Sequence, residues 1–197
     1  MNKIEFGIMA VFIVAMTQVA SASALVINPS DDGSVYLDGG VLTNCYLTAC
    51  EPTRGVVEFP TSQILWPIST AYLSVNPYGL PLWSKTVQIY GYGSSDGQLT
   101  SSDYDAGNYL GVLILPEDLG YGEDALFEVT SFMQGVSTPF VGFNIRSEYA
   151  KTDIFSSLEY NEGHSAQLLV SPIPEPSTII LILAGLPLLG FRKNHGS

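Results

Sequence analysis

Short runs in which apolar and polar residues alternate recur along the middle of the chain, and they restrict the fold most. In residues 70–76, Ala71, Leu73 and Val75 occupy every second position. A period of two places such residues on one face of a β-strand, so the pattern predicts a half-buried strand. The same alternation predicts strands at three further segments, 85–90, 140–146 and 165–171.

Other segments complete an all-β pattern. Shorter apolar runs, separated by clusters of Gly, Pro, Asn and Asp, predict strands at 34–37, 55–59, 110–115, 125–129 and 154–160. Only residues 130–136 indicate a helical turn. Short strands that each bury one face pack most economically as two sheets. The sequence therefore predicts an all-β, antiparallel β-sandwich, jelly-roll-like, over residues 25–171.

The first 24 residues have the pattern of a secretory signal peptide. Lys3 precedes an apolar run at 6–16, and Ala22 and Ala24 then form an A-x-A cleavage site. Cleavage after Ala24 by signal peptidase, following passage through the Sec translocon, would leave Leu25 as the first residue. The alternative is an uncleaved anchor, but the run of about 11 residues is short against the roughly 20 that a spanning helix needs.

Residues 172–197 form a different kind of tail. Pro174-Glu175-Pro176 keeps the chain extended, because prolines lack the backbone donor and disfavour helix before them. Ser177 can cap a helix over the apolar residues 178–191, which would span ~21 Å against ~30 Å of hydrocarbon. The basic pair at 192–193 would hold the end in the cytoplasm. Such a short helix suits transient residence in the inner membrane; the alternative is an ordinary tail anchor.

The motif Pro174-Glu175-Pro176-Ser177, the apolar stretch and the basic end formed by Arg192 and Lys193 together resemble the PEP-CTERM sorting domain. The resemblance implies that an exosortase, a membrane cysteine protease-transpeptidase, recognises the motif. It also implies a Gram-negative bacterium that makes exopolysaccharide. The expected route is an inner-membrane intermediate, followed by the cell surface or the extracellular matrix.

The middle of the chain resembles a second family, the DNRLRE-type and related carbohydrate-binding domains. The likeness lies in residues 54–59, 68–75, 127–132, 141–146 with 155–159, and 166–170. Two departures stand against it: residues 92–100 replace a Trp-containing stretch, and Glu128 stands where Asp is usual. The resemblance implies a jelly roll that binds glycans.

Charge narrows the range of partners. The part between the two ends, residues 25–173, has 17 of the 19 acidic residues of the chain, because Glu5 and Glu175 lie outside it. It has 4 of the 7 basic residues, because Lys3, Arg192 and Lys193 lie outside it. Its net charge is therefore −13. Such a surface repels nucleic acid and anionic headgroups. It is compatible with Ca²⁺ and with neutral or cationic glycans.

Two cysteines, Cys45 and Cys50, lie close together in this acidic domain. In an exported protein such a pair favours a small disulfide loop. The alternative, a metal site, is disfavoured because no further cysteine and no nearby histidine completes a zinc ligand set.

Acidic residues in predicted loops are the candidate ligands of a structural Ca²⁺ ion. Asp31 and Asp32 precede Gly33, and Asp103 and Asp105 flank a tyrosine. Carboxylates in loops can converge as hard oxygen ligands. None of these groups has the spacing of a recognised calcium loop, so solvated acidic turns are the alternative.

Tyrosines supply the candidate glycan-binding residues. Tyr72, Tyr90 and Tyr92 fall on the polar side of strands that follow one another in the sequence, and we expect these strands to be adjacent. Their rings could stack on sugars while a polar edge stays in water. Tyrosine also favours strands for ordinary packing reasons, which is the alternative.

No catalytic residue is predicted. The exported part has one histidine, His164, and no nucleophile elbow, zincin or phosphate-loop motif. Cys45 and His164 could pair as nucleophile and base, but a disulfide between Cys45 and the nearby Cys50 would prevent this. Asp103 and Asp105 could serve as the two carboxylates of a glycosidase, but a domain with so many acidic residues contains such pairs by chance. The expectation is a non-enzymatic envelope or matrix protein that binds exopolysaccharide. The alternatives are a structural or adhesive matrix protein and an unrecognised glycan hydrolase.

Overall fold

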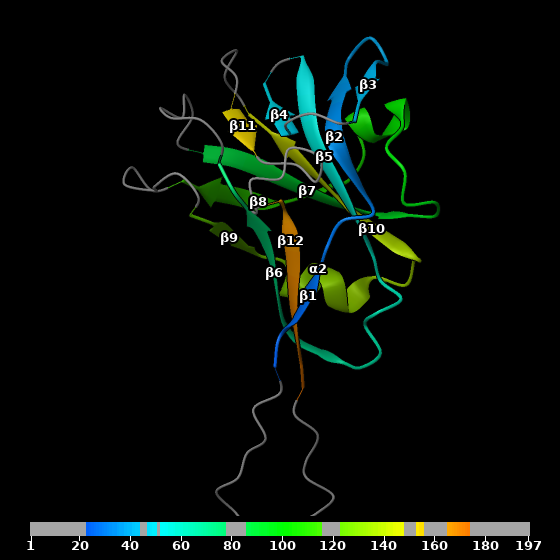
Figure 1. The fold of residues 1–197 in the computed structure, drawn as a ribbon, viewed down its shortest axis with the longest axis vertical. Helices are drawn as coiled ribbons and strands as arrows, with labels where there is room; N and C mark the ends of the chain where they lie inside the picture. The colour runs from blue at the N-terminus through cyan, green and yellow to red at the C-terminus, as the bar shows by residue number, and fades with distance from the viewer. Residues whose placement is uncertain are drawn as a thin grey trace, which may run out of the picture. The chain divides into compact units, whose positions relative to one another are not determined.

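The computed structural model describes residues 23–43, 47–50, 52–77, 86–115, 123–147, 153–155 and 165–173. A compact unit spans Ala24–Pro172. Its strands and short helices, β1 to β12 with η1 and α2, are shown in Figure 1. In the part of the chain that is described, no helix is long and apolar enough to cross a membrane.

Two antiparallel sheets make up most of this unit. The six-stranded sheet has the order β3 (Val41–Leu42), β2 (Asp31–Tyr36), β5 (Thr53–Pro60), β10 (Phe140–Arg146), β7 (Thr86–Ser94) and β8 (Asn108–Ile114). The four-stranded sheet has the order β1 (Leu25–Ile27), β12 (Gln167–Pro172), β6 (Ile68–Val75) and β9 (Ala125–Glu128). A small third sheet pairs β11 (Asp153–Phe155) with β4 (Leu47–Ala49).

Strand pairing is nested, with early strands paired to late ones. β1 pairs with β12, β5 with β10, β6 with β9, and β7 with β8. The four pairs alternate between the two sheets, as in an antiparallel ribbon that is rolled up. This is the arrangement of a jelly-roll-like sandwich, with β2 and β3 added at one edge of the larger sheet.

The main core lies between the two sheets and confirms the alternation that the sequence predicted. On β6, Ala71, Leu73 and Val75 are fully buried, while Tyr72 on the opposite side is half-buried. The apolar positions of three other predicted strands join the same core: Val87, Ile89, Val141, Phe143, Ile145, Ala166, Leu168 and Val170. The predicted all-β sandwich is therefore confirmed.

The helical turn predicted at 130–136 is confirmed as α2 (Thr130–Gly135), which packs on β6. The Ala71 backbone N–H donates to Thr130 Oγ1 at 2.9 Å. Gln134 Nε2 donates to the Ile68 carbonyl at 2.9 Å, and Met133 enters the core. α2 is thus fixed to one end of the four-stranded sheet.

One predicted loop is wrong. The sequence predicts Asp31 and Asp32 in a loop, but they begin β2 and pair with Glu58 and Val57 of β5. β5 runs on to Pro60, so its backbone groups extend far enough to pair with two acidic residues that have poor strand propensity. Pairing with the long strand β5 therefore outweighs the low strand propensity of the two aspartates.

A core substitution tests the packing. Phe143 is fully buried, and its ring meets Phe59 at 6.1 Å and Phe132 at 5.7 Å between centroids. Phe143→Ala should lower the free energy of unfolding by about 3–5 kcal/mol, because it leaves a cavity in a close-packed core. Leu65→Ala, at a position that is 81% exposed, should change it by less than about 0.5 kcal/mol. Equal losses in urea denaturation would contradict this core.

Candidate functional site

The six-stranded sheet carries a second layer of side chains on the face that points away from the main core, which we call the outer face. Directly opposed residues of antiparallel strands share a face, so the register determines the neighbours. One row contains Asp31, Glu58, Gly142 and Tyr92. The row beside it contains Val56, Asn144 and Tyr90. Beyond that row, Val35 pairs with Arg54, and Arg146 pairs with Gln88.

Residues 98–106 connect β7 to β8 and lie across part of the outer face; we call this segment the strap. It includes the 3-10 turn η1 (Ser101–Tyr104), which contacts β2 and β5. Leu99 and Tyr104 pack with Val35 and Val56 in a second small apolar cluster, and Tyr92 packs against it. The strap therefore buries part of a sheet face that would otherwise meet solvent.

Side chains of β10 hold one end of the strap. Asn144 Nδ2 donates to the carbonyls of Asp103 and Tyr104 at 2.6 and 2.9 Å, and Asn144 is fully buried. Arg146 Nη2 donates to the Ala106 carbonyl at 3.1 Å. These bonds satisfy strap carbonyls that have no partner in a sheet ladder, which is what a buried connection requires.

The other end of the strap is held by β2. The Leu99 N–H donates to Asp31 Oδ2 at 2.9 Å. Within the strap, the Thr100 N–H donates to Asp103 Oδ2 at 2.6 Å, and the Thr100 hydroxyl donates to the same oxygen at 3.0 Å. Two of the predicted acidic residues, Asp31 and Asp103, thus accept backbone hydrogen bonds that fold the strap onto the sheet.

Glu58 is a fully buried carboxyl group on this face. Tyr92 donates its hydroxyl hydrogen to Glu58 Oε1 at 2.9 Å, and no described residue hydrogen-bonds to Oε2. Burial raises the pKa of Glu58 from 4.5 to about 7; hydrogen bonding by Tyr92 and Ser94 opposes the rise, and the charges of Asp103 and Asp96 add to it. Burial, and then the charge of Glu58, also raises the pKa of Tyr92.

The outer face beyond the strap carries an open group of aromatic and polar side chains, which we call the aromatic strip: Gln88, Tyr90, Tyr109 and Arg146. The Tyr90 and Tyr109 rings meet edge to face at 5.5 Å, and Tyr109 is 55% exposed. The Arg146 guanidinium lies 3.7 Å from the Tyr90 ring centroid, and the Tyr90 hydroxyl donates to Gln88 Oε1 at 3.0 Å. Burial, then the charge of Arg54, lowers the pKa of Arg146.

The three predicted tyrosines do not form one group. Tyr90 and Tyr92 lie two residues apart on β7 and share the outer face. Tyr72 lies on β6, opposite Glu128 and Leu169, and belongs to the other sheet. The expectation that these strands are adjacent is therefore wrong. Tyr92 is also engaged with Glu58 and the strap cluster, so the structure leaves Tyr90 as the open member.

The four candidate calcium ligands do not all come together in one group. Asp31 and Asp32 are consecutive strand residues, so their side chains point to opposite faces of the sheet. Asp32 is fully buried opposite Val57, whereas Asp105 is exposed after η1. Among the described residues, no three His, Cys, Asp or Glu side chains are grouped to hold a metal ion. The calcium site stays a prediction.

Several predicted residues lie outside the described part of the chain: Ala22, Cys45, Pro174, Glu175, Pro176, Ser177, Arg192 and Lys193. Ala24 immediately precedes β1. Cys50 is half-buried, and its backbone pairs with that of Thr53 in an isolated antiparallel β-bridge across a tight turn. The signal cleavage, the Cys45–Cys50 disulfide and the sorting motif therefore stay predictions.

The alternation of apolar and polar residues does not single out Glu58 or Asn144, because polar residues on the outward side of a half-buried strand ordinarily face solvent. One signal was available for Glu58. It lies in Gly55-Val56-Val57-Glu58-Phe59, where apolar residues occupy both faces of the strand. A strand with apolar residues on both faces is covered on both faces, so an acid within it is buried.

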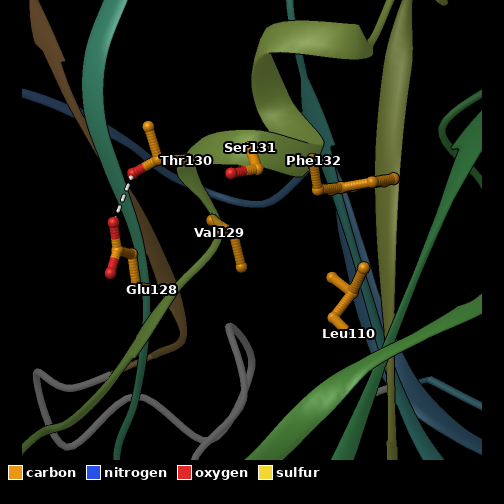
Figure 2. A pocket seen from close by; sticks show the side chains of 6 residues that line it. All are labelled: Leu110, Glu128, Val129, Thr130, Ser131 and Phe132. Carbon is orange, nitrogen blue, oxygen red and sulfur yellow. Dashed lines mark hydrogen bonds between the residues drawn. The ribbon is translucent and has the colours of Figure 1, made fainter.

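Figure 2 shows a hollow where α2 begins and β8 and β9 come close together. Its volume is about 250 Å³, and it is lined by Leu110, Glu128, Val129, Thr130, Ser131 and Phe132. Thr130 donates its hydroxyl hydrogen to Glu128 Oε1 at 3.2 Å, while Phe132 and Leu110 form an apolar side. None of the residues predicted as site residues lies in this hollow.

Comparison with known proteins leaves both resemblances as predictions. No protein-family model matches the chain, and no curated protein matches it.

A glycine on the outer face provides a test of the Glu58–Tyr92 pair. A Cβ added at Gly142 would lie 2.1 Å from Tyr92 Cζ, so Gly142→Ala must displace the ring from Glu58. We expect a loss of about 1–3 kcal/mol in the free energy of unfolding, as for other overpacked sites. Gly135→Ala, where no atom lies within 4 Å of the added Cβ, should not destabilise the protein. Urea midpoints of the two variants should differ; matching midpoints would refute this packing.

Proposed function

We propose that this is an exported, non-enzymatic envelope or extracellular-matrix protein that binds exopolysaccharide on the aromatic strip. The observation that carries the proposal is the group formed by Tyr90, Tyr109, Gln88 and Arg146. It combines two aromatic rings with a guanidinium and an amide on one sheet face. Aromatic rings can pack on the apolar faces of sugars, and the polar groups can hydrogen-bond to sugar hydroxyls.

The chemistry of the strip favours particular glycans. The domain around it has a net charge of −13 over residues 25–173, which repels polyanions at long range. Arg146 is a local cation, since a guanidinium remains charged at neutral pH. A neutral polysaccharide, or one with amino sugars, therefore suits the strip better than a polyuronate.

The nested strand pairing supports the finer part of the proposal, the likeness to jelly-roll carbohydrate-binding domains. Three of its four pairs join strands that are not consecutive in the sequence, and β1 with β12 is the most distant of them. Leu25 begins β1 and is the register partner of Val170 in β12. Signal cleavage after Ala24, and processing near Pro174, would therefore leave both strands intact.

A purely adhesive role is the second candidate, and β8 favours it. This edge strand of the six-stranded sheet carries no charged residue, and Val112 and Ile114 are 42% and 70% exposed. Exposed apolar edge strands can pair with other chains. If no glycan binds while the protein associates through β8, the adhesive role replaces the proposed one.

Binding to a panel of neutral and amino-sugar polysaccharides tests the proposal. Tyr109→Ala should weaken binding by about tenfold, or ~1.4 kcal/mol, because it removes the most exposed ring of the strip. Tyr72→Ala, on the other sheet, should leave binding unchanged. Equal losses in both variants would place the site elsewhere. Repeating the titration with CaCl₂ and with EDTA tests the proposed structural Ca²⁺ ion.

The proposed sorting role has its own test. Changing Pro174-Glu175-Pro176 to Ala-Ala-Ala should preserve or extend the helix after it, because alanine favours helix where proline forbids it. The variant should be exported but should accumulate as an uncleaved, membrane-bound form in cells that have the matching exosortase. Mass analysis decides the question: if wild type and variant both keep residues 177–197, or both lose them equally, a plain tail anchor is the better description.

A further inference from the structure

We propose that the hollow beside α2 binds a single amino-sugar unit of a glycan, whose ammonium group lies against the Glu128 carboxylate. The inference rests on the proposed function, because it names the class of sugar that the same domain selects. It also adds a second site, since the residues that line the hollow are different from those of the aromatic strip.

The hollow lies where the outermost strands of the two sheets approach each other. β8 ends the six-stranded sheet, β9 ends the four-stranded sheet, and the two strands contact each other. The lining residues come from β8, from β9 and from the start of α2 (Figure 2). Sites for drug-sized ligands occupy roughly 300–1,000 Å³. A hollow of about 250 Å³ therefore suits one sugar ring rather than several.

Leu110 and Phe132 form the apolar wall of the hollow. A Cβ added at Gly91 would lie 2.8 Å from Leu110 Cδ1 and 2.8 Å from Phe132 Cε1, so both side chains fill the space over that glycine. Phe132 also packs edge to face on Phe143, with 5.7 Å between the ring centroids. The wall is thus held in place by the main core. An aromatic ring in such a wall can pack on the C–H face of a sugar.

Glu128 supplies the charge on the polar side of the hollow. Its Oε1 accepts a hydrogen bond from the Thr130 hydroxyl at 3.2 Å. Thr130 is in turn held by β6, because its Oγ1 accepts from the Ala71 N–H at 2.9 Å. Glu128 and Ser131 are both exposed, so a ligand can reach the carboxylate and the neighbouring hydroxyl. The carboxylate is therefore accessible and is positioned by a residue that is fixed to the sheet.

The charge in the hollow selects a cationic ligand. An ionised carboxylate only accepts hydrogen bonds, and its strongest partners are charged donors such as an ammonium group. The lining residues include Glu128 but no lysine or arginine. An acidic sugar would place a second negative charge against Glu128, whereas an amino sugar offers three N–H donors. The Ser131 hydroxyl can donate to a ring hydroxyl or accept from it.

The hollow adjoins the aromatic strip along β8. Tyr109 belongs to the strip, and the next residue of the strand, Leu110, belongs to the wall of the hollow. The Cα atoms of consecutive residues are only about 3.8 Å apart. A glycan that lies on Tyr109 can therefore continue over this edge of the sheet and place an amino-sugar unit in the hollow.

Titration of the full chain with glucosamine, followed by amide chemical shifts, tests the site. The Ser131 and Leu110 amides should shift, and glucosamine should bind about tenfold more tightly than N-acetylglucosamine, which has the same ring without the charge. Glu128→Gln keeps an acceptor for Thr130 but removes the charge, so it should weaken glucosamine binding about tenfold and leave N-acetylglucosamine binding unchanged. Glu123→Gln removes an equal charge from an exposed residue before β9 and should match wild type.

Two results would overturn the proposal. One is equal affinity of the wild-type protein for glucosamine and N-acetylglucosamine. The other is a preference for glucosamine that persists in Glu128→Gln or falls equally in Glu123→Gln.

The same measurements separate this site from the aromatic strip. If glucosamine shifts the Tyr90 and Tyr109 amides but not that of Ser131, the amino sugar binds on the strip and only the site in the hollow fails. If glucosamine binding depends on Glu128 while polysaccharide binding is unaffected by Tyr109→Ala, only the proposed role of the strip fails.

Discussion

The ring of Phe143 packs where three parts of the domain meet, and the arrangement of both sheet faces depends on it. Phe143 lies on β10 in the middle of the six-stranded sheet, and it contacts Phe59 of β5 and Phe132 of α2. Since side chains alternate along β10, burying Phe143 inward turns its neighbours Gly142 and Asn144 outward. The main core thus determines which residues support Tyr92 and the strap.

Local pattern predicted the strands well, and it failed where long-range pairing decides. The segments 70–76 and 140–146 have clear alternation, and both correspond to strands, β6 and β10. β1, β3 and β4 were not predicted, because two or three residues are too few to show a period. Asp31 and Asp32 read as a turn, yet pairing with β5 makes them a strand.

The candidate site could be predicted only in part, for a related reason. Period two correctly placed Tyr90 and Tyr92 on one face of β7. It could not show that Tyr72 belongs to the other sheet, because consecutive strands of a nested pairing alternate between sheets. Tyr109 was not singled out, and its contact with Tyr90 depends on an irregular register between β7 and β8 at Ile89 and Tyr90.

The main core and the strap are stabilised in different ways, and this difference matters for function. The main core gains its stability from large apolar side chains, as in any close-packed interior. The strap has only a small apolar cluster and depends also on Asp31, Asn144 and Arg146, whose hydrogen bonds go to its backbone. Backbone-directed bonds hold a segment in one position while leaving its sequence and charge free to vary. Such a segment can open locally without unfolding the sandwich, because breaking its few bonds leaves the Phe143 core untouched.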